Sequence, residues 1–152
     1  MLVAALAVAA ALPAPGVFVP GRSLGGVALG DTPAQVRARW GADHGVCRRC
    51  GHRTWYFTYR RFAPAGAGVE FRRGRVFALF TLWQPRGWHT RKGVLIGDAV
   101  AEVTAAYGPM LRVDCGSYYA LARHTRGVTT AFYVLDEKVW GFGLTRLQGP
   151  CR

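Results

Sequence analysis

Four cysteines are the side chains in this 152-residue chain whose spacing best suits covalent or metal chemistry. Cys47 and Cys50 form a C-x-x-C-G segment flanked by two histidines, a form found in zinc knuckles, redox-active dithiols and local disulfides. Cys115 and Cys151 stand alone further along the chain, so the second paired knuckle of a tetrahedral zinc site is missing. We therefore favour disulfides, and a zinc site at Cys47 and Cys50 stays the alternative.

Sequence motifs for catalysis are missing. Ser23 and Ser117 are the only serines, neither lies in a G-x-S-x-G elbow, and no H-E-x-x-H segment or glycine-rich phosphate loop occurs. The histidines fall where loops and turns are expected, Asp31, Asp98 and Asp136-Glu137 at helix starts or in a turn, and Glu70 at an exposed strand position. We expect a non-catalytic protein without a cofactor or a bound metal.

The formal charge of the chain is +12, and lysine supplies only Lys92 and Lys138 among its 20 basic residues. Arginine can neutralise phosphates, but these arginines are scattered and no recognition helix or RNA-binding aromatic motif accompanies them. We expect no nucleic-acid partner, and the arginine-rich surface leaves anion binding as an alternative.

The amino terminus indicates export. Residues 2–12 are an unbroken apolar run, and Ala14 and Gly16 suit the small-residue positions before a cleavage point. The run is shorter than the ~20 residues that span a bilayer, so we expect no stable membrane span. The sequence thus predicts a signal peptide at residues 1–16 and a secreted or extracytoplasmic protein.

An internal repeat organises the remaining chain. Residues 26–41, GVALGDTPAQVRARWG, recur as residues 93–108, GVLIGDAVAEVTAAYG, with eight identities at one offset. In the first copy Thr32 to Gln35 read as a capping box with proline at the first helical position, and Gly41 can end the helix. In the second copy we expect Asp98 to cap the helix and Gly108 to end it.

Strands are expected after each helix, because alternating aromatic and polar residues have a period of two. The expected strands cover residues 54–60, 68–71 and 76–82, then 117–122, 129–135 and 139–147. Short helices need a sheet to lie on. The sequence therefore predicts an α+β fold of two tandem repeats, each a short helical segment packed on an antiparallel β-sheet, at residues 17–83 and 93–152, joined by a basic linker at 84–92.

The bulky residues of the hairpins predict which face of the sheet is buried. The face expected to pack on the helices carries Phe77/Trp140, Leu79/Phe142, Val69/Phe132 and Phe71/Val134. The opposite face and the linker supply the candidate partner-binding residues: Tyr56, Arg60, Arg72, Phe80, Trp83, Trp88 and Tyr133. Tyrosine, tryptophan and arginine often anchor interfaces, although the same residues can simply cover the solvated side of a sheet.

The repeat also suggests a cysteine pairing. Cys47 and Cys115 occupy nearly equivalent places after their helices, and an exported chain with an even cysteine count normally carries disulfides. We expect the local pairs Cys47–Cys50 and Cys115–Cys151, one in each repeat.

A family resemblance rests on the Gly-Asp-Thr-x-x-x-Val-x-x-x-x-Gly pattern, followed by a Trp-Tyr strand and a hairpin. The matching residues are Gly30, Asp31, Thr32, Val36, Gly41, Trp55 and Tyr56, then Gly97, Asp98, Val103, Gly108, Tyr118 and Tyr119. The pattern resembles the small-lipoprotein (SmpA/OmlA-type) domain of the outer-membrane barrel-assembly machinery, and two units in tandem resemble the beta-lactamase inhibitory protein family. This resemblance implies an α+β fold and a role in binding other proteins.

The sequence as a whole favours an exported, non-catalytic, monomeric protein-binding module, inhibitor-like or envelope-associated, with an unknown protein partner. The alternative is a zinc- or anion-binding envelope protein that uses the Cys47/Cys50 loop or the arginine-rich surface.

Overall fold

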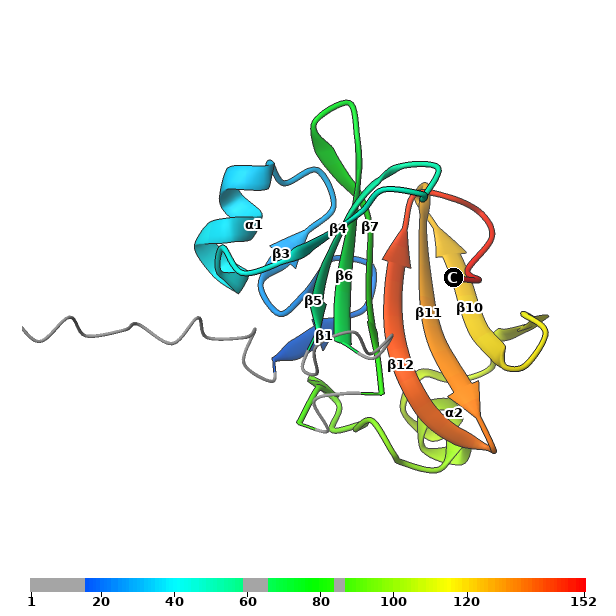
Figure 1. Ribbon diagram of the computed structural model, residues 1–152. Helices are drawn as coiled ribbons and strands as arrows, with labels where there is room; N and C mark the ends of the chain where they lie inside the picture. The colour runs from blue at the N-terminus through cyan, green and yellow to red at the C-terminus, as the bar shows by residue number, and fades with distance from the viewer. Residues whose placement is uncertain (1–15, 59–65, 84–86) are drawn as a thin grey trace, which may run out of the picture.

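The computed structural model describes residues 16–58, 66–83 and 87–152 (Figure 1). The expected signal peptide, apart from Gly16, and the candidate Arg60 lie outside these residues. The first described strand begins at Val17, directly after the expected cleavage point. Within the described ranges, no helix has the length and apolar character needed to cross a membrane.

Eight antiparallel strands form the main sheet. In spatial order they are β4 (Gly45–Cys47), β5 (Arg53–Thr58), β6 (Gly66–Arg72), β7 (Arg75–Leu82), β12 (Lys138–Thr145), β11 (Val128–Leu135), β10 (Tyr119–Thr125) and β9 (Leu111–Asp114). The order is symmetric about the β7·β12 pair, with four strands from each half of the chain. A duplication would produce this order, and the duplication itself stays a prediction.

The expected α+β architecture is wrong, because the described part of the chain is mostly β, with 48% of its residues in strands and 13% in helices. The two helices, α1 (Pro33–Trp40) and α2 (Val100–Tyr107), have only eight residues each. Figure 1 shows α1 beside β3 and β4, and α2 near β11 and β12. Short segments rich in β-branched and aromatic residues pair as strands beside these helices, instead of serving only as connections.

These short segments form a second sheet that ties the two halves together. Its order is β3 (Val27–Ala28), β2 (Ser23–Leu24), β1 (Val17–Val19) and β8 (His89–Thr90). Strand β8 lies within the expected linker of residues 84–92 and pairs in parallel with β1. The segment that was expected to join two repeats therefore contributes a strand to a shared structure.

The first helix begins as the sequence predicts. The Gln35 amide donates to Thr32 Oγ1 and the Thr32 amide donates to Gln35 Oε1, which completes the capping box. Gly41 ends this helix with a φ of 87°. The expected cap of the second helix is wrong, because Ala99 is at the N-cap and makes no side-chain hydrogen bond there.

Asp31 and Asp98 hold turns rather than helix ends. The Asp31 carboxylate accepts the Ala28 amide at 2.9 Å, and the Asp98 carboxylate accepts the Leu95 amide at 2.7 Å. Each carboxylate is thus occupied by the turn that precedes its helix. The backbone carbonyls of the same two aspartates accept amides at the starts of β7 and β12, so the repeated Gly-Asp turns dock on equivalent strands.

The main core lies between one face of the large sheet, the helices and the small sheet. Phe18 of β1 stacks on Phe142 at 4.9 Å and meets Phe132 edge-on at 5.6 Å. Three of the expected core pairs are confirmed as members of this cluster: Leu79/Phe142, Val69/Phe132 and Phe71/Val134. The residues of both halves share one core.

The fourth expected core pair, Phe77/Trp140, is wrong. Register shifts between Glu70 and Phe71, and between Tyr133 and Val134, leave Phe77 and Trp140 without opposite partners. Each is the extra residue of a β-bulge, and a one-residue shift sends a side chain to the other face. Phe77 consequently packs on a histidine and an arginine, and Trp140 packs on Tyr118, outside the main core.

Gly68 gives a test of the packing on the second face of the sheet. A Cβ at this position would overlap the ring of Phe80, which lies across the glycine from the neighbouring strand. We expect Gly68→Ala to lower the free energy of unfolding by about 1–3 kcal/mol, measured by urea denaturation. Gly45→Ala is the matched control, since a Cβ at this β4 position meets no atom within 4 Å. Equal losses in both variants would contradict this packing.

Candidate functional site

The second face of the large sheet was expected to be open, but the carboxy-terminal segment, residues 146–152, covers its second half. Figure 1 shows this segment, in red, crossing from the end of β12 toward β10. The Thr129 hydroxyl donates to the Leu147 carbonyl at 2.7 Å, and the Tyr133 hydroxyl donates to the Pro150 carbonyl at 2.9 Å. The face is therefore partly an internal surface.

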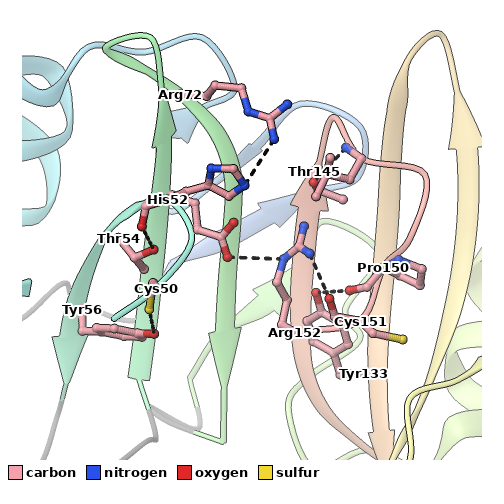
Figure 2. Close-up of polar contacts among 12 residues, drawn as sticks. Cys50, His52, Thr54, Tyr56, Arg72, Tyr133, Thr145, Pro150, Cys151 and Arg152 are labelled. Carbon is pink, nitrogen blue, oxygen red and sulfur yellow. Dashed lines mark hydrogen bonds and ion pairs between the residues drawn. The ribbon is translucent and has the colours of Figure 1, made fainter. Parts of the chain in front are cut away.

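Covalent and polar contacts anchor this carboxy-terminal segment. Cys151 is bonded to Cys115, and the Tyr118 hydroxyl contacts the backbone of Arg152. The Arg152 guanidinium lies 3.7 Å from the Glu70 carboxylate of β6, in the other half of the sheet (Figure 2). The segment thus connects the outer strands of the second half to the centre of the first half.

Two candidate partner-binding residues on this face are buried. Tyr133 is 1% exposed, and burial raises the pKa of its hydroxyl. Phe80 packs with Tyr133, Ala120 and Ala131 in a small second cluster. Their assignment to an open binding face is wrong, because the carboxy-terminal segment covers Tyr133, and Phe80 packs against Gly68 and Tyr56 within the sheet.

The two candidate residues near the linker, Trp88 and Trp83, differ in their exposure. Trp88 has no exposed surface, and its ring meets Trp40 edge-on at 6.1 Å in the main core, so its assignment to the surface is wrong. Trp83 is 52% exposed.

Tyr56 of β5 is half-buried, and burial is the main cause that raises the pKa of its hydroxyl. This hydroxyl lies 3.6 Å from Cys50 Sγ.

Both disulfides have the expected local pairing. Cys47 is bonded to Cys50, and Cys115 is bonded to Cys151. All four sulfurs are therefore engaged in disulfides, and the Cys47/Cys50 loop offers no thiolate to a zinc ion. The zinc alternative at this loop is wrong for the oxidised protein.

The exposed candidate Arg72 belongs to a group of arginines at one end of the large sheet. Figure 1 shows this end, at the top, where the β4–β5 loop and the β6–β7 turn lie. The exposed members, which we call the arginine cluster, are Arg48, Arg49, Arg53, Arg72, Arg73, Arg75 and Arg146. Arg75 donates to the Gly30 carbonyl at 3.4 Å, and Arg146 lies close to the same glycine, so the cluster extends to the end of β12.

Aromatic rings hold two of these guanidinium groups. Arg72 lies 4.7 Å from the centre of the Phe77 ring, and its Nη2 is 3.2 Å from His52 Nε2 (Figure 2). Arg53 lies 5.2 Å from the centre of the Trp55 ring. Cation–π contact fixes a guanidinium while its outer N–H groups stay available for a ligand.

His44 also packs on Trp55, with the two rings stacked at 3.8 Å. Burial, followed by the nearby Arg37 guanidinium, lowers the pKa of His44 below its ordinary value. The lowered pKa favours the neutral form of His44.

Carboxylates do not neutralise the cluster. In the described part of the chain, the two ion pairs join Arg39 to Asp31 and Arg152 to Glu70, so neither engages a cluster member. Three of the eight acidic residues instead lie toward the opposite end of the sheet: Asp114, Asp136 and Glu137. The molecule thus presents a strongly positive end and a more acidic end.

Sequence reasoning identified Arg72 but missed the other cluster members. Arg73 and Arg75 flank a glycine in the β6–β7 turn, and Arg48 and Arg49 lie between the paired cysteines. Hairpin turns and disulfide loops project into solvent, so these positions carried a usable signal. What the sequence does not reveal is that both loops lie at the same end of one sheet.

Comparison with known proteins informs the fold alone. No family model matches the sequence, and no curated protein matches it significantly. The structure is similar to an extracellular protein containing an SCP domain from Bacillus anthracis, with a TM-score of 0.54, 10% identity, and coverage of 77% of this chain and 43% of that one. A DUF4309 family protein from Bacillus subtilis has a TM-score of 0.47 and 11% identity, with 82% of each chain covered.

The described chain spans less than half of the Bacillus anthracis protein. At this identity the similarity extends to the arrangement of strands and not to a function. Neither protein is named as a member of the families that the sequence resembles, so that resemblance stays a prediction.

Proposed function

We propose that this chain is an exported, non-catalytic domain that binds an acidic surface of another protein through the arginine cluster. The observation that carries the proposal is a group of seven exposed arginines at one end of the large sheet, none of which forms an ion pair with a carboxylate in the described part of the chain. Functional residues commonly lie on loops that a rigid scaffold positions.

Export is supported by the two disulfides, since structural disulfides persist mainly in oxidising compartments. Cleavage after Gly16 would leave β1 intact, including Phe18, which is fully buried in the main core. The amino-terminal segment and the fold are thus compatible with a mature chain that begins at Val17.

A protein partner is favoured over a simple polyanion by the apolar surface beside the arginines. Val46 of the edge strand β4 is 55% exposed and lies next to Cys47, at the start of the arginine-bearing loop. Arginine is enriched among protein-binding hot spots, and a protein surface can bury an exposed apolar side chain that lies beside it. A polyanion would use the charges alone.

The test is charge reversal within the cluster. The double variant Arg49→Glu/Arg72→Glu should weaken binding to a partner captured from the native secretome by at least about tenfold, mainly through a slower association rate. Surface plasmon resonance at several salt concentrations measures both quantities. The matched control is Arg22→Glu/Arg91→Glu, which makes the same charge change at exposed positions outside the cluster.

Each outcome of this comparison supports or contradicts a localised interface at the arginine cluster. A control that stays within about twofold of the unmodified protein supports a localised interface. Equal losses in both double variants would replace it with binding governed by net charge, as expected for an anionic polymer. Unchanged affinity in both would contradict the assignment of the cluster.

A further inference from the structure

A cavity of about 380 Å³ lies at the end of the sheet opposite the arginine cluster. It is bounded by the end of β7, the β11–β12 hairpin and the turn before α2. The residues that line it are Trp83, Ile96, Gly97, Leu135, Asp136, Lys138, Val139 and Trp140. Its volume falls within the ordinary range of small-molecule sites.

Trp83 is held in an unusual backbone conformation at this cavity. Its φ is 66°, in the left-handed region that bulky residues rarely adopt, and its side chain is 52% exposed. The Trp83 amide donates to the Trp140 carbonyl at 2.7 Å, which fixes the position of this residue at the end of β7. A strained conformation that keeps a large ring in solvent does not serve the core, and such outliers concentrate at ligand sites.

A second indole lines the same cavity because of the β-bulge in β12. The bulge turns Trp140 away from the main core, and its ring packs on Tyr118 at 5.2 Å, which limits its rotation. Tyr118 is itself held by the carboxy-terminal segment. The cavity therefore has one exposed and one firmly positioned indole in its lining.

The charged groups of the lining have opposite signs. Asp136 and Lys138 both border the cavity, and in the described residues neither takes part in an ion pair. An anionic ligand would meet the Asp136 carboxylate, and a cationic ligand would meet the Lys138 ammonium. A neutral ligand with many hydroxyl groups can instead donate hydrogen bonds to the Asp136 carboxylate and accept them from the Lys138 ammonium.

We propose that this cavity binds a neutral, β-linked glycan. The rings of such sugars carry equatorial hydroxyl groups around two flat faces of axial C–H bonds. An indole ring is a flat apolar surface that can stack on such a face, and its negative electrostatic potential attracts the C–H bonds. The carboxylate and the ammonium then supply the acceptor and the donor that hydroxyl groups require.

This site is independent of the proposed protein-binding surface, since the β6–β7 turn and the β11–β12 hairpin lie at opposite ends of the sheet (Figure 1). Glycan binding and partner binding should therefore be separable by mutation. The arginine double variant should bind glycan as the unmodified protein does.

The test uses isothermal titration calorimetry of the mature chain with two neutral hexasaccharides, cellohexaose and hexa-N-acetylchitohexaose. We expect saturable binding of at least one of them that is insensitive to salt, because the ligand is neutral. Trp83→Ala should weaken this binding by about tenfold or more, and Trp83→Phe should retain part of it. Leu111→Ala is the control, because this 70% exposed apolar residue lies on β9 and does not line the cavity.

Asp136→Asn keeps the test decisive if Trp83→Ala changes the fold, which circular dichroism would reveal. It preserves the size of the side chain and should also weaken binding. Absence of saturable binding to both hexasaccharides would overturn the proposal. An affinity that neither Trp83→Phe nor Asp136→Asn changes would also overturn it, as would an affinity that is lost at high salt.

Discussion

Replacing Trp88 with alanine should lower the free energy of unfolding by about 3–5 kcal/mol, as expected for the removal of a fully buried indole. The ring lies in the main core against Trp40, and a Cβ at Gly25 would overlap it. Trp88 also directly precedes β8, the strand that joins the second sheet to the segment between the two halves. The loss should therefore disrupt both sheets, and urea denaturation followed by circular dichroism measures it.

Trp83→Ala provides the matched comparison, because it removes the same side chain five positions earlier in the sequence. Trp83 is largely in solvent, so we expect its loss to change the free energy of unfolding by less than about 1 kcal/mol. Similar losses in the two variants, or a larger loss for Trp83→Ala, would contradict the structural placement of these residues.

Removal of the Cys115–Cys151 disulfide should have the second large effect. This bond closes a loop with a sequence separation of 36, and loop entropy assigns it about 4 kcal/mol. The double variant Cys115→Ala/Cys151→Ala also frees the segment that covers Tyr133. We expect a lower urea midpoint together with increased exposure of this tyrosine, which near-ultraviolet circular dichroism detects.

The control is Cys47→Ala/Cys50→Ala, which removes a disulfide with a sequence separation of only three. The same entropy argument gives this short loop about 2 kcal/mol or less. If the short loop proves the more stabilising of the two, or if peptide mapping finds a bond between the two loops, the local pairing is wrong.

Local chemistry explains which parts of the fold were predictable. The capping box of Thr32 and Gln35 is complete within four residues, and the structure forms it as expected. The alternation of core residues such as Val69 and Leu79 likewise depends only on the two-residue period of a strand. Patterns whose interactions involve only a few neighbouring residues can be interpreted without knowledge of the rest of the chain.

Features that depend on distant segments were not predictable from such patterns. The bulges at Phe77 and Trp140 follow from pairing with β6 and β11, and no local signal marks the extra residue. Tyr133 has the composition of an interface residue, but the carboxy-terminal segment covers it. The small sheet likewise forms only because β1 and β8, far apart in sequence, lie side by side.

In the candidate site, too, single residues were predictable from the sequence, but their arrangement was not. The sequence predicted that Arg72 is exposed, and it is exposed in the structure. Its grouping with Arg49 and Arg53 requires the β5·β6 register, which places Arg53 opposite Phe71 and His52 near Arg72. The charged surface is therefore a product of topology, although each arginine is visible in the sequence.

The most direct test of the central claim is amide hydrogen exchange of the mature chain, free and bound to its partner. Our account predicts slower exchange in the complex at the β4–β5 loop and the β6–β7 turn, where the arginine cluster lies, with little change at α2 and β9. Protection confined to α2 or β9, with unchanged exchange at the β4–β5 loop and the β6–β7 turn, would contradict it.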